Sequence, residues 1–234
     1  MMNPNISPEN GVGIYEQDYT QGPACAIACG AGTIYRNYFV PVRGQIGQTT
    51  EHQIDCLELL GTVLGNHDSC LWEMENGYAL VRQDGLLSIN SYISNLDFEQ
   101  REQLKEKLKI GLQWDTEVTL TEAKHVVSQA YCSALPVAYS AVDSLYWEPF
   151  ARLILEATYE ATLHAALINF EKTACDKVFL TLVGAGVFGN KIDWVMDSIK
   201  MAITKFLTTP LDIKIISYGS SNRAVLELLK ELKI

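Results

Sequence analysis

The sequence predicts an α/β protein, a three-layer α/β/α sandwich around a mixed, largely parallel sheet. Apolar strand-like runs alternate with helical segments through the C-terminal half, which is typical of parallel strands covered by helices on both faces. A hairpin pattern in the middle of the chain adds an antiparallel pair, so the sheet is expected to be mixed. Glycine-rich segments follow two apolar runs, where ligands bind in many α/β proteins.

In the N-terminal half, residues 48–65 form the clearest helical segment, because their apolar residues repeat at helical spacing. Thr49 or Thr50 is expected to cap its start, and Gly65 is expected to end it. Residues 77–89 are typical of a β-hairpin that turns at their Asp-Gly dipeptide. These assignments place a helix and a hairpin before the alternating half of the chain.

The second half is predicted to be richer in regular structure. Asp97 is a good N-cap for a charged surface helix, and Pro149 suits the first turn of a long helix. The expected strands are 114–120, 125–139, 177–183 and 212–220. The expected helices are 97–109, 148–170, 193–207 and 223–233. The strand within 125–139 is apolar enough to be central in the sheet.

One domain is expected over residues 12–234, because the 234-residue chain has no linker rich in Pro, Gly or Ser. Residues 1–11 are polar and contain two prolines, which indicates a flexible N-terminal tail. A weak alternation over residues 13–19 predicts a short strand directly after the tail. All candidate functional residues would then lie in this domain.

Composition excludes several classes of function. A net charge of −10 argues against nucleic-acid binding. No apolar run is long enough to cross a membrane, and no secretory signal is visible at the N-terminus. Six cysteines without a C-x-x-C pair are typical of free thiols in a reducing compartment, so a cytoplasmic location is expected. The histidines show no zinc-ligand spacing, and neither a metal nor a cofactor is expected.

The segment Gly184-Ala185-Gly186-Val187-Phe188-Gly189 matches the G-x-G-x-x-G pattern. It lies between a predicted strand and a helix that Asn190 would cap, so backbone amides would face a bound phosphate. A Rossmann domain is excluded, because too little chain follows and the next strand does not end in an acidic residue. The segment therefore predicts a phosphate site in another fold.

A second small-residue segment, Cys29-Gly30-Ala31-Gly32-Thr33, also follows an apolar run. If both runs were strands of one parallel sheet, the two loops would meet at its carboxyl edge and could hold a pyrophosphate between them. The alternative is that both segments are tight turns that need glycine for backbone reasons alone.

The order of these segments resembles the macrodomain, the module that binds ADP-ribose. The stretches that carry the resemblance are "HVVSQAYCSALP", "EPFARLILEATYEATLHAAL", "VFLTLVGAGVFGN" and "DIKIISYG". The chain is most similar to the divergent poly(ADP-ribose)-glycohydrolase-like branch, which includes bacterial effector ADP-ribosylhydrolases. The resemblance implies an ADP-ribose-binding protein that hydrolyses an ADP-ribosyl linkage on protein, acting in its own cytoplasm or, as an effector, in that of a host.

The resemblance also implies which residues touch the ligand. Phosphates and riboses would be contacted by the two small-residue segments and their neighbours, namely Cys29, Gly30, Ala31, Gly32, Thr33, Tyr35, Arg36, Asn37, Gly184, Ala185, Gly186, Val187, Phe188, Gly189 and Asn190. Asp55, on the helix expected over residues 48–65, is the candidate catalytic acid, with a solvated surface carboxylate as the alternative. Glu156 and Glu160, one helical turn apart, are expected to face solvent.

Two alternatives to a hydrolase remain open from the sequence. A non-catalytic reader of ADP-ribosylated proteins would use the same loops without turnover. A plain interaction domain would use its glycines only for turns and would bind no nucleotide. ADP-ribose or an ADP-ribosylated protein is the partner that the first two hypotheses share.

Overall fold

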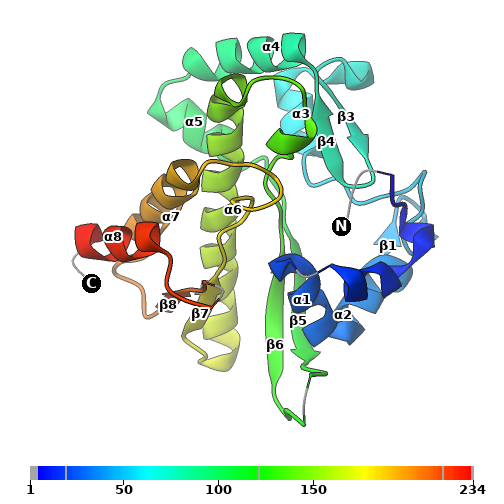
Figure 1. Cartoon of the computed structure of the whole chain (residues 1–234), viewed down its shortest axis with the longest axis vertical. Coiled ribbons are helices and arrows are strands. Elements are labelled where there is room, and N and C mark those ends of the chain that lie inside the picture. Colours follow the sequence, from blue (N-terminus) through cyan, green and yellow to red (C-terminus); the bar gives the residue numbers. More distant parts are fainter. Residues whose placement is uncertain (1–4, 19, 121, 218, 233–234) are drawn as a thin grey trace. The chain divides into compact units, whose positions relative to one another are not determined.

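The computed structural model describes residues 5–18, 20–120, 122–217 and 219–232 of the chain, which is drawn in Figure 1. The chain divides into two compact units. The first comprises Met1–Asp55, Met74–Tyr78 and Gly111–Tyr131, and the second Cys56–Glu73, Ala79–Ile110 and Cys132–Ile234. Each is described by itself. The single domain expected over 12–234 stays a prediction, since compact units can be parts of one folding domain.

The mixed α/β class is confirmed, but the described strands do not form one sheet. They make four two-stranded sheets, β1–β2, β3–β4, β5–β6 and β7–β8. The β1–β2 and β5–β6 pairs are antiparallel, and β7–β8 is parallel. Strands joined by a short connection pair antiparallel, whereas a parallel pair needs a crossover, which helix α7 supplies between β7 and β8.

The first unit consists of short helices and antiparallel strands. Its elements are η1 (Pro8–Asn10), η2 (Val12–Gln17), α1 (Gln21–Ala28), α2 (Gly30–Ile34), the π-helical η3 (Tyr35–Phe39), β1 (Pro41–Val42), β2 (Gln45–Ile46), β5 (Gly111–Glu117) and β6 (Val126–Tyr131). The strand predicted over 13–19 is wrong, because Val12–Gln17 form a 3-10 helix. The strand predicted within 125–139 is confirmed as β6, but it is partly exposed rather than central.

The small apolar residues before and after Gly30 are helical, so the strand and loop that the two-loop hypothesis requires do not form there. Alanine favours the helix, and this segment has no run of β-branched residues to oppose it. Gly32 lets α2 lie close to the β5–β6 pair, because a Cβ atom at this position would come within 2.8 Å of the Tyr131 hydroxyl. Packing therefore explains this glycine.

Glu9, in η1, links the N-terminal segment to residues far along the chain. Its carboxylate accepts hydrogen bonds from the Thr50 amide at 2.6 Å and from the Thr50 hydroxyl at 2.9 Å. The Thr50 amide is the main reason why the pKa of Glu9 falls from its ordinary 4.5 to about 2. Residues 1–4 of the expected tail lie outside the described part of the chain, and the flexibility of the tail stays a prediction.

We expect this link to break only in strong acid. A carboxyl group whose pKa is depressed in the folded state stabilises the fold above its unfolded value, and this contribution is lost as the pH falls from 4.5 to about 2. NMR titration of the Glu9 side-chain carboxyl should show a midpoint of about 2. Thr50→Val, which keeps the amide, should retain most of the shift. An unshifted midpoint would contradict the contact.

The second unit is mainly helical and is built around one long helix. Its elements are α3 (Glu58–Leu64), η4 (His67–Ser69), α4 (Gln83–Ser94), α5 (Phe98–Lys105), η5 (Val137–Tyr139), α6 (Ser144–Thr173), β7 (Lys177–Leu180), α7 (Ile192–Phe206), β8 (Asp212–Ile215) and α8 (Arg223–Leu232). Helix α6 contacts α4, α5 and α7, and its side chains form much of the core. The predicted strands and helices after residue 140 are confirmed, with shifted ends.

Two boundaries in the middle of the chain differ from the prediction. The hairpin turns at Asn76-Gly77, between β3 (Trp72–Glu75) and β4 (Tyr78–Val81), where both turn residues have positive φ angles of 46° and 85°. This Asn-Gly pair is the stronger hairpin signal, and the Asp-Gly pair instead lies in the first turn of α4.

The helix predicted over 48–65 begins only at Glu58. Thr49 and His52 form a separate turn, in which each amide donates to the other residue's carbonyl at 3.0 and 3.2 Å. The predicted end is confirmed, since Gly65 closes α3 with φ 81°. The cap of α5 is also confirmed, because Asp97 accepts a hydrogen bond from the Gln100 amide at 2.8 Å.

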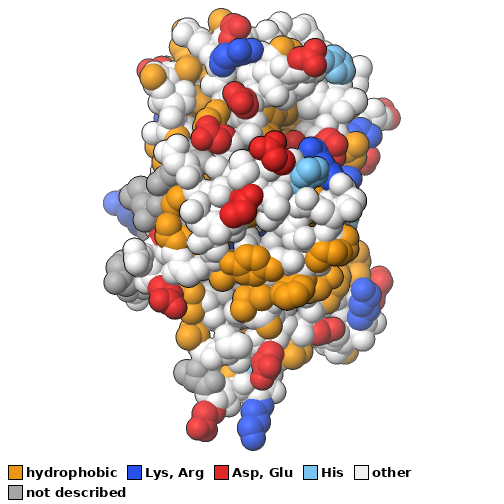
Figure 2. Space-filling view, turned by 90° about the vertical axis from the view of Figure 1, so that its right-hand side faces the viewer, with side chains coloured by type: hydrophobic (Ala, Val, Ile, Leu, Met, Phe, Trp, Pro, Cys, Tyr) orange, Lys and Arg blue, Asp and Glu red, His pale blue; other side chains and the backbone are white. Residues whose placement is uncertain are grey.

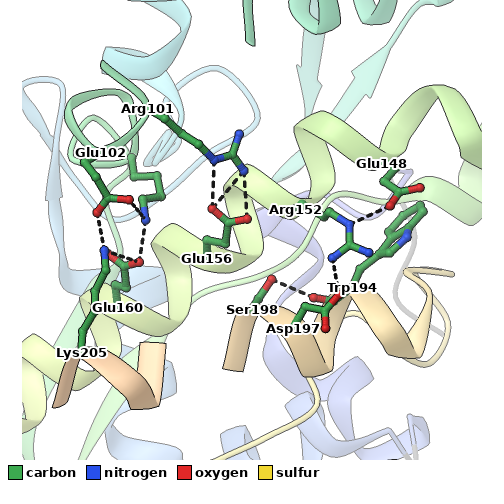
Figure 3. Close-up of polar contacts among 11 residues, drawn as sticks. Arg101, Glu102, Glu148, Arg152, Glu156, Glu160, Trp194, Asp197, Ser198 and Lys205 are labelled. Atoms are coloured by element: carbon green, nitrogen blue, oxygen red, sulfur yellow. Dashed lines mark hydrogen bonds and ion pairs between the residues drawn. The ribbon is translucent and has the colours of Figure 1, made fainter. Parts of the chain in front are cut away.

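Glu156 and Glu160 on α6 do not face solvent as expected. Arg101 Nη2 lies 2.9 Å from Glu156 Oε1, and Lys105 Nζ lies 2.6 Å from Glu160 Oε1. Glu102 and Lys205 join the Lys105–Glu160 pair in an ion-pair network among α5, α6 and α7, and the Arg101–Glu156 pair stands apart from it (Figure 3). The two glutamates therefore hold helices together instead of forming a catalytic pair.

Candidate functional site

The glycine segment 184–190 is the candidate site, and it lies where the sequence predicted it. It follows β7 and precedes α7, whose apolar face is fully buried at Trp194, Val195 and Ile199. The parallel partner of β7 is β8, so these elements form a strand–loop–helix–strand unit. Loops at the carboxyl end of such strands are the usual place for ligands in α/β proteins.

The fold itself requires glycine at two of the three glycine positions in this segment. Gly184 has φ +77°, and a Cβ atom there would lie 2.3 Å from Ala134 Cβ. Gly189 has φ +72°, and a Cβ atom there would lie 2.7 Å from Ala138 Cβ. Only glycine adopts this backbone readily and leaves room for the neighbouring segment. At these two positions, glycine is therefore explained by the tight turn and needs no ligand.

Gly186 has no such explanation. Its φ lies outside the left-handed region, and no atom of the described residues lies within 4 Å of the Cβ position. Gly186 and Val187 are exposed, and their amides have no hydrogen-bond partner in the part of the chain that the structure describes. The middle of the loop thus presents free donors and open space, which is the arrangement that backbone phosphate sites need.

Asn190 does not cap α7, which corrects the prediction. Its Nδ2 atom donates to the carbonyl of Leu135 at 2.9 Å and to that of Gly184 at 3.4 Å. The helix N-cap is Lys191, whose side chain makes no capping bond. Buried carbonyls must be satisfied, so the amide of this buried side chain is used to close the loop.

Tyr159 fixes the point where the strand becomes the loop, and the sequence reading did not single it out. Its hydroxyl donates to the Thr181 carbonyl at 2.8 Å and accepts from the Val183 amide at 3.0 Å. Burial raises the pKa of this phenol well above its ordinary value. Its place on the apolar side of the long helix could have identified it in the sequence, since a buried tyrosine hydroxyl needs hydrogen-bond partners.

The Phe188 carbonyl accepts a hydrogen bond from the Ala138 amide at 2.9 Å. The Phe188 ring meets the Tyr139 ring edge-on, with 5.7 Å between centroids. Two contacts thus hold the loop against the η5 segment, one through the backbone and one through the rings. These contacts fix the position of the loop on one side of its exposed middle residues.

Among the described residues, Arg152 on α6 and Lys191 at the start of α7 differ in how their charges are compensated. Arg152 lies 2.7 Å from Glu148 and 2.8 Å from Asp197 (Figure 3). Asp193 lies 3.7 Å away, so three carboxylates compensate this arginine. Lys191 makes no ion pair with any described residue, and its Nζ lies 5.2 Å from the centre of the Trp194 ring. Lys191, which directly follows the loop in the sequence, is therefore a cation that no described carboxylate neutralises.

The other candidate segment, Cys29 to Asn37, is helical and belongs to the first unit. Thr33 donates to the Ala26 carbonyl at 2.8 Å, and Asn37 donates to the Pro8 carbonyl at 3.1 Å. Arg36 donates to the Tyr15 hydroxyl at 2.7 Å. These polar groups are engaged within the unit.

The remaining members of this segment differ in exposure. Cys29 and Gly32 are buried, Gly30 is partly buried, and Ala31 and Tyr35 are exposed. Since Gly30 opens a helix, the premise that two strand–loop junctions of one sheet converge is wrong. The ligand roles of these residues stay predictions.

Asp55 lies in an irregular segment before α3 rather than on a helix, and its side chain is partly exposed. It belongs to the first unit, whereas residues 184–190 belong to the second. Its role as an acid stays a prediction. Residues 29–37 belong to the same unit as Asp55.

The described residues contain no group of three or more His, Cys, Asp or Glu side chains placed to hold a metal ion. No described helix combines the length and apolarity needed to cross a membrane. No protein-family model, curated protein or solved structure matches this chain.

Proposed function

We propose that this protein binds a phosphorylated ligand at residues 184–190, with ADP-ribose as the first candidate. The observation that carries the proposal is the uncrowded, exposed position of Gly186. The other two glycines of the segment are explained by backbone and packing. Among the described residues, nothing crowds Gly186, and its amide and that of Val187 have no partner. A net charge of −10 does not oppose this, because backbone amides bind anions without a basic surface.

We further propose that the fold is macrodomain-like, with the three-layer architecture and largely parallel sheet that the resemblance implies. The support is the parallel pair β7–β8, joined through the glycine segment and α7. A cytoplasmic location is part of the same proposal and rests on six cysteines that are all free thiols.

The experiment that tests ligand binding is calorimetric titration with ADP-ribose, with AMP and NAD as comparators. Saturable binding of ADP-ribose, tighter than that of AMP, is the expected result, because a second phosphate adds contacts to the loop amides. No heat of binding with any of the three at millimolar concentration would overturn the proposal.

Hydrolysis of an ADP-ribosyl linkage is the catalytic form of the same proposal, with Asp55 as the acid or base. Asp55→Asn is then expected to lower release of ADP-ribose from a modified protein by about 100-fold or more, while ADP-ribose affinity changes little. The control is Glu51→Gln, an exposed acid nearby in the same unit. Equal turnover in both variants would exclude Asp55. If the chain without substitutions shows no turnover, the non-catalytic reader of ADP-ribosylated proteins is the form of the proposal that remains.

An interaction domain is the second candidate function, and exposed apolar side chains of the first unit favour it. Hydrophobic side chains gather in a band on the face shown in Figure 2. Exposed large apolar residues of the first unit include Ile34, Tyr35, Phe39 and Ile46. Such surfaces are typical of protein contacts. This candidate predicts no nucleotide binding, so the same titration separates it from the first.

A further inference from the structure

A cavity of about 280 Å³ lies within the second unit, beside strand β4 and the start of helix α6. Two kinds of side chain that a ligand can reach contribute to its lining. Leu80 and Tyr139 are half-buried and offer apolar surface, whereas Glu73 and Arg82 are exposed and carry opposite charges. A lining of this kind suits a ligand that is charged at one end and apolar at the other.

The β3–β4 hairpin places Glu73 and Arg82 on the same face. The hairpin has a two-residue turn, and the Arg82 amide donates to the Leu71 carbonyl at 3.4 Å, which fixes the antiparallel register. In this register Leu80 lies opposite Glu73, and Arg82 is the diagonal neighbour of Glu73. Diagonal neighbours are about 7–8 Å apart at their backbones, within reach of long side chains. Two opposite charges therefore border one cavity at a short spacing.

These two charges do not neutralise each other. Glu73 forms no ion pair with Arg82 or with any other described residue. Arg82 Nη2 donates to the Cys70 carbonyl at 2.5 Å, and its Nε lies 3.9 Å from Asp84. The contact with Asp84 is long and joins two mostly exposed side chains, so it contributes little. A carboxylate and a guanidinium group are thus both left for a ligand.

The turn before β3 adds a second sign of a binding site. Asp68 and Ser69 have positive φ angles of 52° and 55°, and Ser69 lines the cavity. Residues other than glycine adopt this backbone conformation infrequently, and such residues cluster at ligand sites. The strained backbone and the two uncompensated charges therefore occur in the same place.

The size of the cavity restricts the ligand to a small molecule. An apolar cavity of about 150 Å³ is enough to hold benzene, whereas sites for larger organic ligands start at about 300 Å³. A volume of about 280 Å³ leaves room for a charged head group and a short branched hydrocarbon chain. An amino acid of the size of leucine is within this limit.

We propose that this cavity binds a small zwitterion, an α-amino acid with an apolar side chain. The ligand carboxylate accepts from the Arg82 guanidinium group, and the ligand ammonium group donates to the Glu73 carboxylate. The ligand side chain packs against Leu80 and Tyr139. Glu73 repels a carboxylate that lacks the ammonium group, and Arg82 repels an amine that lacks the carboxylate. None of residues 184–190 lines the cavity, so this proposal does not depend on ADP-ribose binding.

The test is NMR titration of the full chain with L-leucine and three analogues, each lacking one part of it. Isocaproate lacks the ammonium group, isopentylamine lacks the carboxylate, and glycine lacks the side chain. L-Leucine should shift the Leu80 methyl signals and bind at least about tenfold more tightly than each analogue, the factor that one charged hydrogen bond supplies. Absence of saturable binding at about 10 mM L-leucine, or an analogue that binds as tightly, would overturn the proposal.

Glu73→Gln tests the partner of the ammonium group. It should lower L-leucine affinity about tenfold and raise isocaproate affinity, because it removes the negative charge. Glu73 is exposed, so this variant should fold. The matched control is Glu106→Gln, which changes another exposed, unpaired glutamate of the described second unit away from the cavity and should change neither affinity. An unchanged ratio of the two affinities in Glu73→Gln would overturn the proposed ligand class.

Arg82→Gln tests the partner of the carboxylate. It should lower L-leucine affinity about tenfold without lowering isopentylamine affinity, because only the first ligand carries a carboxylate. The matched control is Arg223→Gln, since Arg223 is also exposed, also contacts one carboxylate and does not line the cavity. Equal losses for L-leucine and isopentylamine in Arg82→Gln would show that Arg82 does not read the carboxylate and would overturn the zwitterion assignment.

Discussion

Replacing Gly186 with glutamate is expected to weaken ADP-ribose binding several hundred-fold while leaving the free energy of unfolding nearly unchanged. No atom in the described part of the chain lies within 4 Å of the Cβ position, so a side chain can start there without a clash. The carboxylate of the new glutamate would lie beside the backbone amides of the loop, which are the proposed donors to the phosphates of ADP-ribose. Repulsion of this kind is worth about 3–4 kcal/mol near a surface, or a loss of several hundred-fold. Calorimetry and denaturant unfolding measure the two effects separately.

Two controls make this result specific to the loop. Gly22→Glu adds the same charge at an exposed helical glycine that also has open space, and it should leave binding intact. Gly184→Ala should instead destabilise the protein by about 2 kcal/mol or more, because it introduces both a positive-φ alanine and a clash. Unchanged ADP-ribose affinity in Gly186→Glu would exclude this loop as the ligand site.

Arg101→Ala is expected to give the largest loss of stability among the ion-pair variants. It leaves the Glu156 carboxylate, which is 6% exposed, without its bidentate partner. Breaking such a pair costs about 3–5 kcal/mol when it is fully buried. We expect about 3 kcal/mol, because the Arg101 side chain is still 25% exposed and water screens part of the interaction.

Urea unfolding of three variants checks this prediction. Lys200→Ala breaks a pair with Glu231 in which both side chains are well exposed, and it should cost less than about 1 kcal/mol. The double replacement Arg101→Met with Glu156→Leu should recover most of the loss, since apolar residues of similar size remove the stranded charge. A loss below about 1 kcal/mol for Arg101→Ala would show that the pair does not stabilise the fold.

The sequence by itself determined the elements whose signals are local. Asp97 caps α5 and Gly65 ends α3 because the hydrogen bond and the left-handed backbone that these roles need involve only neighbouring residues. The β7–loop–α7–β8 unit followed from a strong change of hydrophobic period. The Asn76-Gly77 turn was also readable from the sequence, as the preferred pair for a tight hairpin.

Only the tertiary structure decided how residues with several possible partners are used. Asn190 is a good cap by type, yet its side chain satisfies the buried carbonyl of Leu135, which is distant in sequence. Glu156 resembles a surface acid until α5 brings Arg101 against it. Likewise, the three glycines of one motif are not equivalent, because Ala134 and Ala138 crowd two of them and no described residue crowds Gly186. Such choices depend on long-range contacts, which hydrophobic period and residue type do not encode.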